Sequence, residues 1–160
     1  MTITPALLIG PLQSNHYVLL KEGQGITHEE SVKAPLYNVN CYNWVLGHIL
    51  QHRDIMLDLL GFEKVMTDDE AALYEAGSKP ISEDGPSVPF ERLMDMLTTS
   101  QARLMDALGH VSEEDLAKLP TSGGERTLGN RLNGLIWHET YHVGQTEYTR
   151  QIAGKNDQIL

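Results

Sequence analysis

The sequence is poor in cysteine, in basic residues and in long apolar runs, and each shortage excludes a class of protein. Cys41 is the only cysteine among 160 residues, which rules out an internal disulfide and fits a reducing compartment. With 12 basic against 22 acidic residues the net charge is −10, which argues against nucleic acid or an anionic membrane surface as the main partner. No stretch approaches the ~20 apolar residues of a membrane span. The N-terminal residues lack a signal-peptide pattern, so we expect a cytoplasmic protein.

The apolar residues that are present recur at three- and four-residue spacings, a pattern that predicts helices. Three long segments show this pattern: residues 38–60, 89–108 and 127–153. None of them has the pattern of a strand. Each segment is followed by a glycine that predicts its end (Gly61, Gly109 and Gly154). Thr127 is the predicted N-cap of the third segment.

Shorter segments complete the predicted fold. We expect a fourth helix around residues 11–21 and a short one that begins at Ser112 and closes before Pro120. Residues 67–89 are acidic and broken by Pro and Gly, so they should form a long crossover with one short helix in its middle. We therefore predict an all-α four-helix bundle, with a long crossover connection and short extra helices, as a single domain over residues 1–160.

Two of the predicted long helices carry pairs of histidines four residues apart: His48 with His52, and His138 with His142. Residues at this spacing share a helix face with Cβ atoms about 5 to 6 Å apart, so two imidazoles can bind one ion at about 2.0 to 2.1 Å. The second pair shares its face with leucines, and buried polar rings need a partner that an ion can supply. Ordinary surface or core histidines are the alternative for either pair.

Residues 138–142 read HETYH, the H-E-x-x-H spacing of zinc metalloproteases. Such a protease needs a third protein ligand further along the chain. The position that holds the third histidine of the extended metzincin motif is Tyr148 here, and neither acidic residue after the motif is suitably placed. We expect the third ligand from upstream. His48 is the best source, because a helix antiparallel to the last one could present it at the same depth.

Two segments resemble the signatures of the DinB/YfiT-like family of metalloenzymes: NWVLGHILQHRD at residues 43–54 and LIWHETYHVGQTEYTRQIAGK at residues 135–155. The resemblance covers most of the chain, with the predicted helices in the same order as in the family. Its most specific part is H-x-x-x-H-x-G-Q. It implies a four-helix bundle with a three-histidine divalent metal site, whose ligands here would be His48, His138 and His142. Because His52 falls where the family usually has no ligand, we interpret it as supporting a ligand or facing solvent.

Three further residues are candidates for supporting roles. Glu139 adjoins His138 but points about 100° around the helix, so it is either a general base reached by a local tilt or a solvated residue. Gln145 lies one heptad after His138. We expect its side chain to lie beneath the metal or to form hydrogen bonds in the interior of the bundle. Cys41 shares the face of His48, and it is either a small buried core residue or a soft fourth ligand at the pocket.

Three neutral histidines leave an ion at least one open coordination position, as in catalytic zinc sites. Because relatives in the resembled family use low-molecular-weight thiols, the resemblance implies a metal-dependent enzyme, thiol S-transferase-like or hydrolase-like, with a small-molecule substrate. The alternative is a non-catalytic metal-binding bundle with a structural, stress-response or sensing role. Both alternatives are compatible with a homodimer. Imidazoles accept several metals, of which we expect zinc or nickel. The sequence names neither the substrate nor the reaction.

Overall fold

The computed structural model describes residues 2–33, 39–119, 124–157 and 159. These residues contain seven helices and no strand, which confirms the all-α prediction. Four helices are long: α1 (Pro5–Glu22), α3 (Tyr42–Leu59), α5 (Phe90–His110) and α7 (Leu128–Ile152). Three are short: α2 (His28–Ser31), α4 (Asp68–Ala72) and α6 (Glu113–Ala117).

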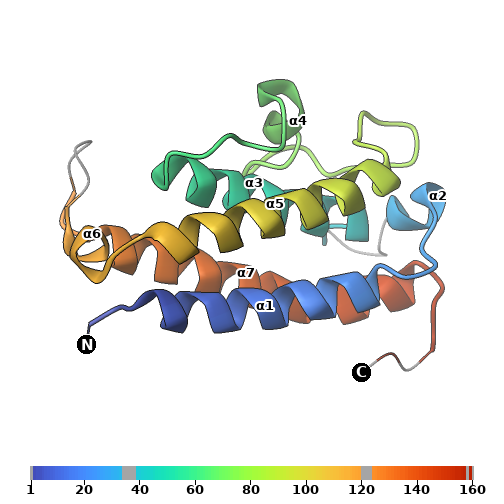
Figure 1. Cartoon of the computed structure of the whole chain (residues 1–160). Coiled ribbons are helices and arrows are strands. Elements are labelled where there is room, and N and C mark those ends of the chain that lie inside the picture. The colour runs from blue at the N-terminus through green and yellow to red at the C-terminus, as the bar shows by residue number, and fades with distance from the viewer. Residues whose placement is uncertain (1, 34–38, 120–123, 158, 160) are drawn as a thin grey trace.

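The four long helices form a bundle in which α1 and α7 run in one direction while α3 and α5 run in the other (Figure 1). Contacts join α1 to α7, α7 to α3, α3 to α5 and α5 to α1, so the helices close into a ring. Because α3 and α5 are parallel, the chain must return along the bundle between them. Residues 60–89 make this return and carry α4, which confirms the predicted crossover.

Three of the four caps predicted for the long helices lie at the ends of those helices. The Thr127 side chain accepts a hydrogen bond from the backbone N–H of Asn130 at 3.3 Å. Gly61 and Gly154, just beyond α3 and α7, have φ angles of +77° and +96°, in the left-handed region that favours glycine. Gly109 was wrongly predicted to end α5. It lies inside the helix, which continues to His110 before the backbone becomes extended.

The first helix begins at Pro5, earlier than the predicted start at residue 11. Proline at the first helical position costs little, because its missing N–H would have had no partner there. Leu8, Leu12 and Leu19 are fully buried and carry one apolar face past Pro11, which lies on the exposed side. Packing of this face thus overrides the break that proline predicts.

Capping boxes start the short helices of the connections. Thr67 and Glu70 form one at α4, which therefore opens the crossover instead of lying in its middle as predicted. Ser112 and Asp115 form another at α6, where the short helix was predicted. Pro120 lies outside the described residues, and α6 ends before it.

A polar layer crosses the bundle and separates two apolar clusters. Each long helix contributes one buried polar residue to it: Asn15, Arg53, Ser100 and Glu139. The apolar clusters lie on either side along the helices, with Leu12, Leu57, Leu104 and Leu132 in one and Leu19, Leu46, Leu97 and Val143 in the other.

A buried ion pair lies in this polar layer. The Arg53 guanidinium donates to both carboxylate oxygens of Glu139, at 2.8 and 2.9 Å, and to the Ser100 hydroxyl at 3.3 Å. Both side chains of the ion pair are 0% exposed, so the pair joins α3 to α7 inside the core.

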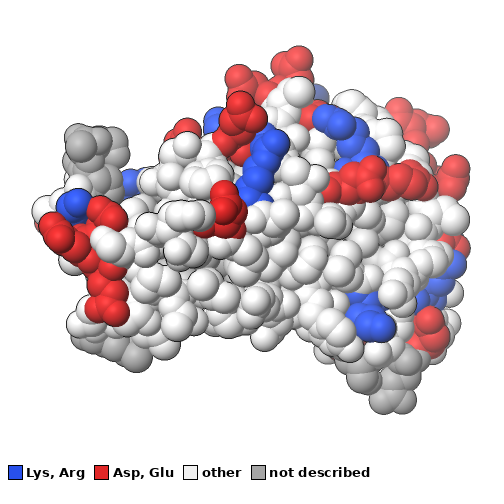
Figure 2. Space-filling view, viewed as in Figure 1, with Lys and Arg blue, Asp and Glu red and all other residues white. Residues whose placement is uncertain are grey.

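Surface charge is unevenly distributed. In the view of Figure 2, charged side chains gather at the upper edge and at the two ends, where most blue groups lie beside red ones. A broad uncharged band lies over α1, whose only charged residues are Lys21 and Glu22. None of the helices in the described ranges combines the length and apolar character needed to cross a bilayer.

Removal of one partner of the buried ion pair should destabilise the fold strongly. Glu139→Ala leaves the Arg53 guanidinium buried without a carboxylate, and we expect the free energy of unfolding to fall by about 3 to 5 kcal/mol. The double variant Arg53→Met/Glu139→Leu removes both charges and should regain most of this loss. Urea unfolding followed by circular dichroism measures the difference. The control is Glu70→Ala, which breaks the exposed pair with Arg92 and should cost ~1 kcal/mol or less. Equal losses in the two single variants would contradict a structural role for the buried pair.

Candidate metal centre

The antiparallel helices α3 and α7 bring His48, His138 and His142 together, as predicted. One ring nitrogen from each histidine lies within 4.8 Å of the others. The Nε2 atoms of His138 and His142 are 3.2 Å apart. Two ligands at about 2.0 to 2.1 Å from one tetrahedral ion would be about 3.4 Å apart, so this spacing fits a shared cation.

Hydrogen bonds orient two of the three rings. His48 Nδ1 lies 2.7 Å from the backbone carbonyl oxygen of Tyr74 and donates to it. His142 Nδ1 lies 2.8 Å from Oε1 of Gln145 and donates likewise. Each ring therefore keeps the lone pair of Nε2 for the centre of the cluster. Metal-ligating histidines are commonly held in this way, so Gln145 acts on the site through His142.

Burial lowers the pKa of each clustered histidine, because loss of water penalises the charged ring. The pKa of His52 falls to about 4. Repulsion from neighbouring histidines lowers the pKa of His48 and His138 further. The rings are therefore neutral at neutral pH, the state in which imidazole can bind a metal.

His52 packs against the cluster but does not join the group of three nitrogens. Its ring stacks on that of His138 with centroids 4.1 Å apart and planes 27° apart. Its Nδ1 lies 3.1 Å from the backbone carbonyl oxygen of His48. We interpreted His52 either as supporting a metal ligand or as facing solvent, and these contacts with His138 and His48 favour the first.

Tyr74, in the crossover after α4, is a site residue that the sequence analysis missed. It is fully buried, and its hydroxyl donates to Asn43 Oδ1 at 2.8 Å and accepts from the N–H of Val88 at 2.9 Å. Its ring lies directly against Gly47, where a Cβ atom would collide with it. The available signal was a glycine in mid-helix, one residue before His48, together with a lone tyrosine in an acidic stretch.

Two surface depressions reach the histidines. The larger, of about 780 Å³, has His138 in its wall and is otherwise lined by residues of α7, the loop before it and Ile55. The smaller, of about 360 Å³, has His142 and Gln145 in its wall, with aromatic side chains from Trp44, Tyr141 and Tyr148. A small molecule can therefore approach the cluster from two depressions.

Glu139 and Cys41 lie apart from the cluster. Glu139 is fully buried, so the prediction of a solvated residue is wrong. Both of its oxygens accept from Arg53, an arrangement that does not fit a general base. The face of α7 that points to the bundle centre carries Glu139, and the histidines lie beside it, toward α3. Cys41 is the N-cap residue of α3 and packs in the core, where burial raises the pKa of its thiol.

The chain belongs to the DinB superfamily, whose family model matches residues 21–146. The matched range includes all three clustered histidines. The fold is similar to that in the crystal structure of a conserved protein from Enterococcus faecalis, with 19% sequence identity and a TM-score of 0.76. That match covers 97% of this chain and 100% of the other, and at this identity it shows the fold alone. No curated protein matches the sequence significantly. The predicted family resemblance is confirmed.

Gly47→Ala should weaken metal binding without removing a ligand. The added Cβ would push Tyr74 away, and the carbonyl that orients His48 would move with it. We expect the affinity for Zn²⁺ to fall about 10- to 100-fold, as for other losses of an orienting partner. Competition with a chromophoric chelator measures this affinity. Gly144→Ala is the matched control, because a Cβ at this helical position meets no atom within 4 Å. If the two variants bind Zn²⁺ equally, Tyr74 does not position His48.

Proposed function

We propose that this member of the DinB superfamily binds one divalent metal ion through His48, His138 and His142 and acts as a metal-dependent enzyme on a small molecule. The observation that carries the proposal is the convergence of three neutral imidazoles next to two depressions. In the described part of the chain, no carboxylate or thiol joins this group. One or more coordination positions would therefore be left for water or substrate.

The donor set fits zinc or nickel, since imidazole suits both ions. When bound, such an ion supplies Lewis acidity, which lowers the pKa of a water molecule or thiol that it coordinates. The protein's own contribution is to hold the rings. Tyr74 and Gln145 fix the tautomers of His48 and His142, and Trp44 stacks on His48 with ring centroids 4.6 Å apart.

The contacts of Glu139 support one of the two predicted reaction types over the other. In an H-E-x-x-H protease the glutamate of the motif is the general base that activates water. Here both oxygens of Glu139 are engaged by Arg53, so the motif offers no such base. A thiol ionises far more readily than water and needs less help from a base. We therefore favour transfer reactions of a low-molecular-weight thiol over hydrolysis.

A second candidate is a metal site that only stabilises the bundle. The ligands come from both α3 and α7, so a bound ion would cross-link two helices that are distant in sequence. An ion that raises the melting temperature but leaves thiols unbound would support this alternative.

The ligand set predicts which variants lose the metal. Protein purified without a nickel column should contain about one divalent ion per chain, and His48→Ala and His142→Ala should contain little, because two histidines hold an ion much more weakly than three. Inductively coupled plasma mass spectrometry measures the content. The control His110→Ala alters an exposed histidine at the end of α5 and should keep the wild-type content. Full metal content in His48→Ala would show that the ligand set is wrong.

Thiol binding distinguishes the enzyme from the structural site. We expect Co²⁺-loaded protein to gain a sulfur-to-cobalt charge-transfer band when 3-mercapto-1-propanol is added, because the thiol can occupy an open position. The band should be absent without Co²⁺ and should persist in His110→Ala. If thiols leave the spectrum unchanged while Co²⁺ stays bound, the thiol-dependent function is refuted and the structural role is favoured.

A further inference from the structure

We infer that the substrate of the histidine site carries an oxyanion, a carboxylate or a phosphate, and that Arg131 and Arg126 bind it. This inference rests on the proposed function, because it names the substrate class of the same site. Both arginines line the larger depression, which also has His138 in its wall. Two cationic side chains beside the cluster stand out in a chain with a net charge of −10.

Among the described residues, Arg126 and Arg131 are the arginines without an ion-pair partner. The other four each contact a carboxylate: Arg53 with Glu139, Arg92 with Glu70, Arg103 with Glu63 and Arg150 with Asp157. None of the residues outside the description is an aspartate or a glutamate, so no acidic side chain there can be their partner. A guanidinium offers five N–H donors in a fork that matches the two oxygens of a carboxylate or phosphate. The guanidinium groups of Arg126 and Arg131 are therefore available to a ligand.

Arg131 lies one heptad before His138 and therefore on the same face of α7. Seven helical residues bring the side chain back to within about 20° of its direction and about 10.5 Å along the axis. Leu135 lies between them on this face and also lines the depression. Arg131 is half-buried, which limits the directions it can take. A ligand would thus span an apolar stretch between its acid group and the atom that reaches the histidines.

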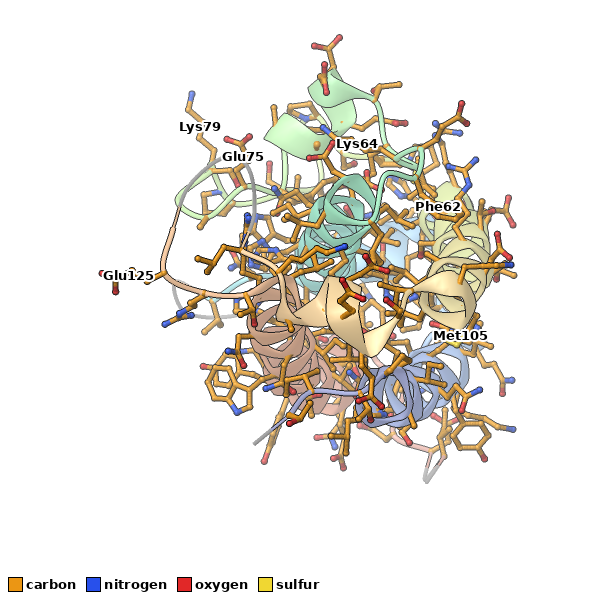
Figure 3. The ribbon with its side chains drawn as sticks, turned by 60° about the vertical axis from the view of Figure 1, so that its left-hand side comes forward. Phe62, Lys64, Glu75, Lys79, Met105 and Glu125 are labelled. Carbon is orange, nitrogen blue, oxygen red and sulfur yellow. The ribbon has the colours of Figure 1, made fainter. Side chains whose placement is uncertain are left out.

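Glu125 is the acidic residue that lines the depression, and it does not cancel the two arginines. Figure 3 shows its side chain pointing outward from the loop before α7, away from the bundle. It is exposed, and it forms no ion pair within the described ranges. Two arginines against one glutamate leave the arginine and carboxylate side chains of the lining with a net charge of +1.

The oxyanion site can be tested without the metal. We would titrate metal-free protein with inorganic phosphate and, separately, with succinate, and follow backbone amide NMR shifts. Saturable shifts are expected in residues 124–138, and Arg131→Gln should weaken binding about tenfold or more, because it removes charge-assisted hydrogen bonds. Arg92→Gln is the matched control, since this arginine on α5 already has Glu70 as its partner, and it should bind like wild type. The tighter ligand identifies phosphate or carboxylate as the class. No saturable binding in this region, or equal affinities in the two variants, would overturn the inference.

A second titration links the two parts of the site. On zinc-loaded protein, 6-mercaptohexanoate, which is long enough to span the apolar stretch, should bind about tenfold more tightly than 6-mercapto-1-hexanol, which has the same thiol without the acid. Arg131→Gln should abolish this preference and leave the affinity for the alcohol unchanged. Equal binding of the two thiols would refute the oxyanion contact while the thiol function stands. If neither thiol binds but phosphate still binds in an Arg131-dependent way, the oxyanion contact stands and the thiol function fails.

Discussion

The buried ion pair between Arg53 and Glu139 sets the register on which the site depends. Arg53 directly follows His52, and Glu139 directly follows His138, so the pair that joins α3 to α7 lies next to the histidines on both helices. A buried charge that loses its partner costs several kcal/mol, so α3 cannot slide along α7 without a large penalty. A slip of one turn, about 5.4 Å, would carry His48 out of reach of the other two ligands.

The H-E-x-x-H letters serve two purposes in this fold. The two histidines of the motif face α3 at the edge of the core, and Glu139, turned about 100° around the helix from His138, points to the centre. The glutamate that a metalloprotease uses for chemistry is used here for packing, because Arg53 occupies both of its oxygens. A site with neutral ligands and no free carboxylate suits a substrate that brings its own readily ionised nucleophile.

Local features were predictable from the sequence, and contacts between distant segments were not. Apolar spacing, Thr127, Gly61 and Gly154 identified the long helices and three of their ends, since caps and periodicity act within a few residues. The i, i+4 pairs predicted where the histidines meet, because each pair already shares a face. The contacts from Arg53 to Glu139 and from His48 to Tyr74 span 86 and 26 residues, and no local pattern marks either. From the sequence, Glu139 was either a catalytic or a solvated residue, and nothing marked Arg53 as its partner. The bundle places the two residues opposite each other.

X-ray absorption spectroscopy at the edge of the bound metal, on protein purified without a nickel column, tests the three-histidine centre most directly. We expect three imidazole scatterers at about 2.0 to 2.1 Å, completed by one or more oxygen atoms from water. The spectrum should gain a sulfur scatterer near 2.3 Å when a small thiol is added. If the metal of the thiol-free protein is coordinated by a carboxylate or a cysteine, or by fewer than three imidazoles, the three-histidine centre is contradicted.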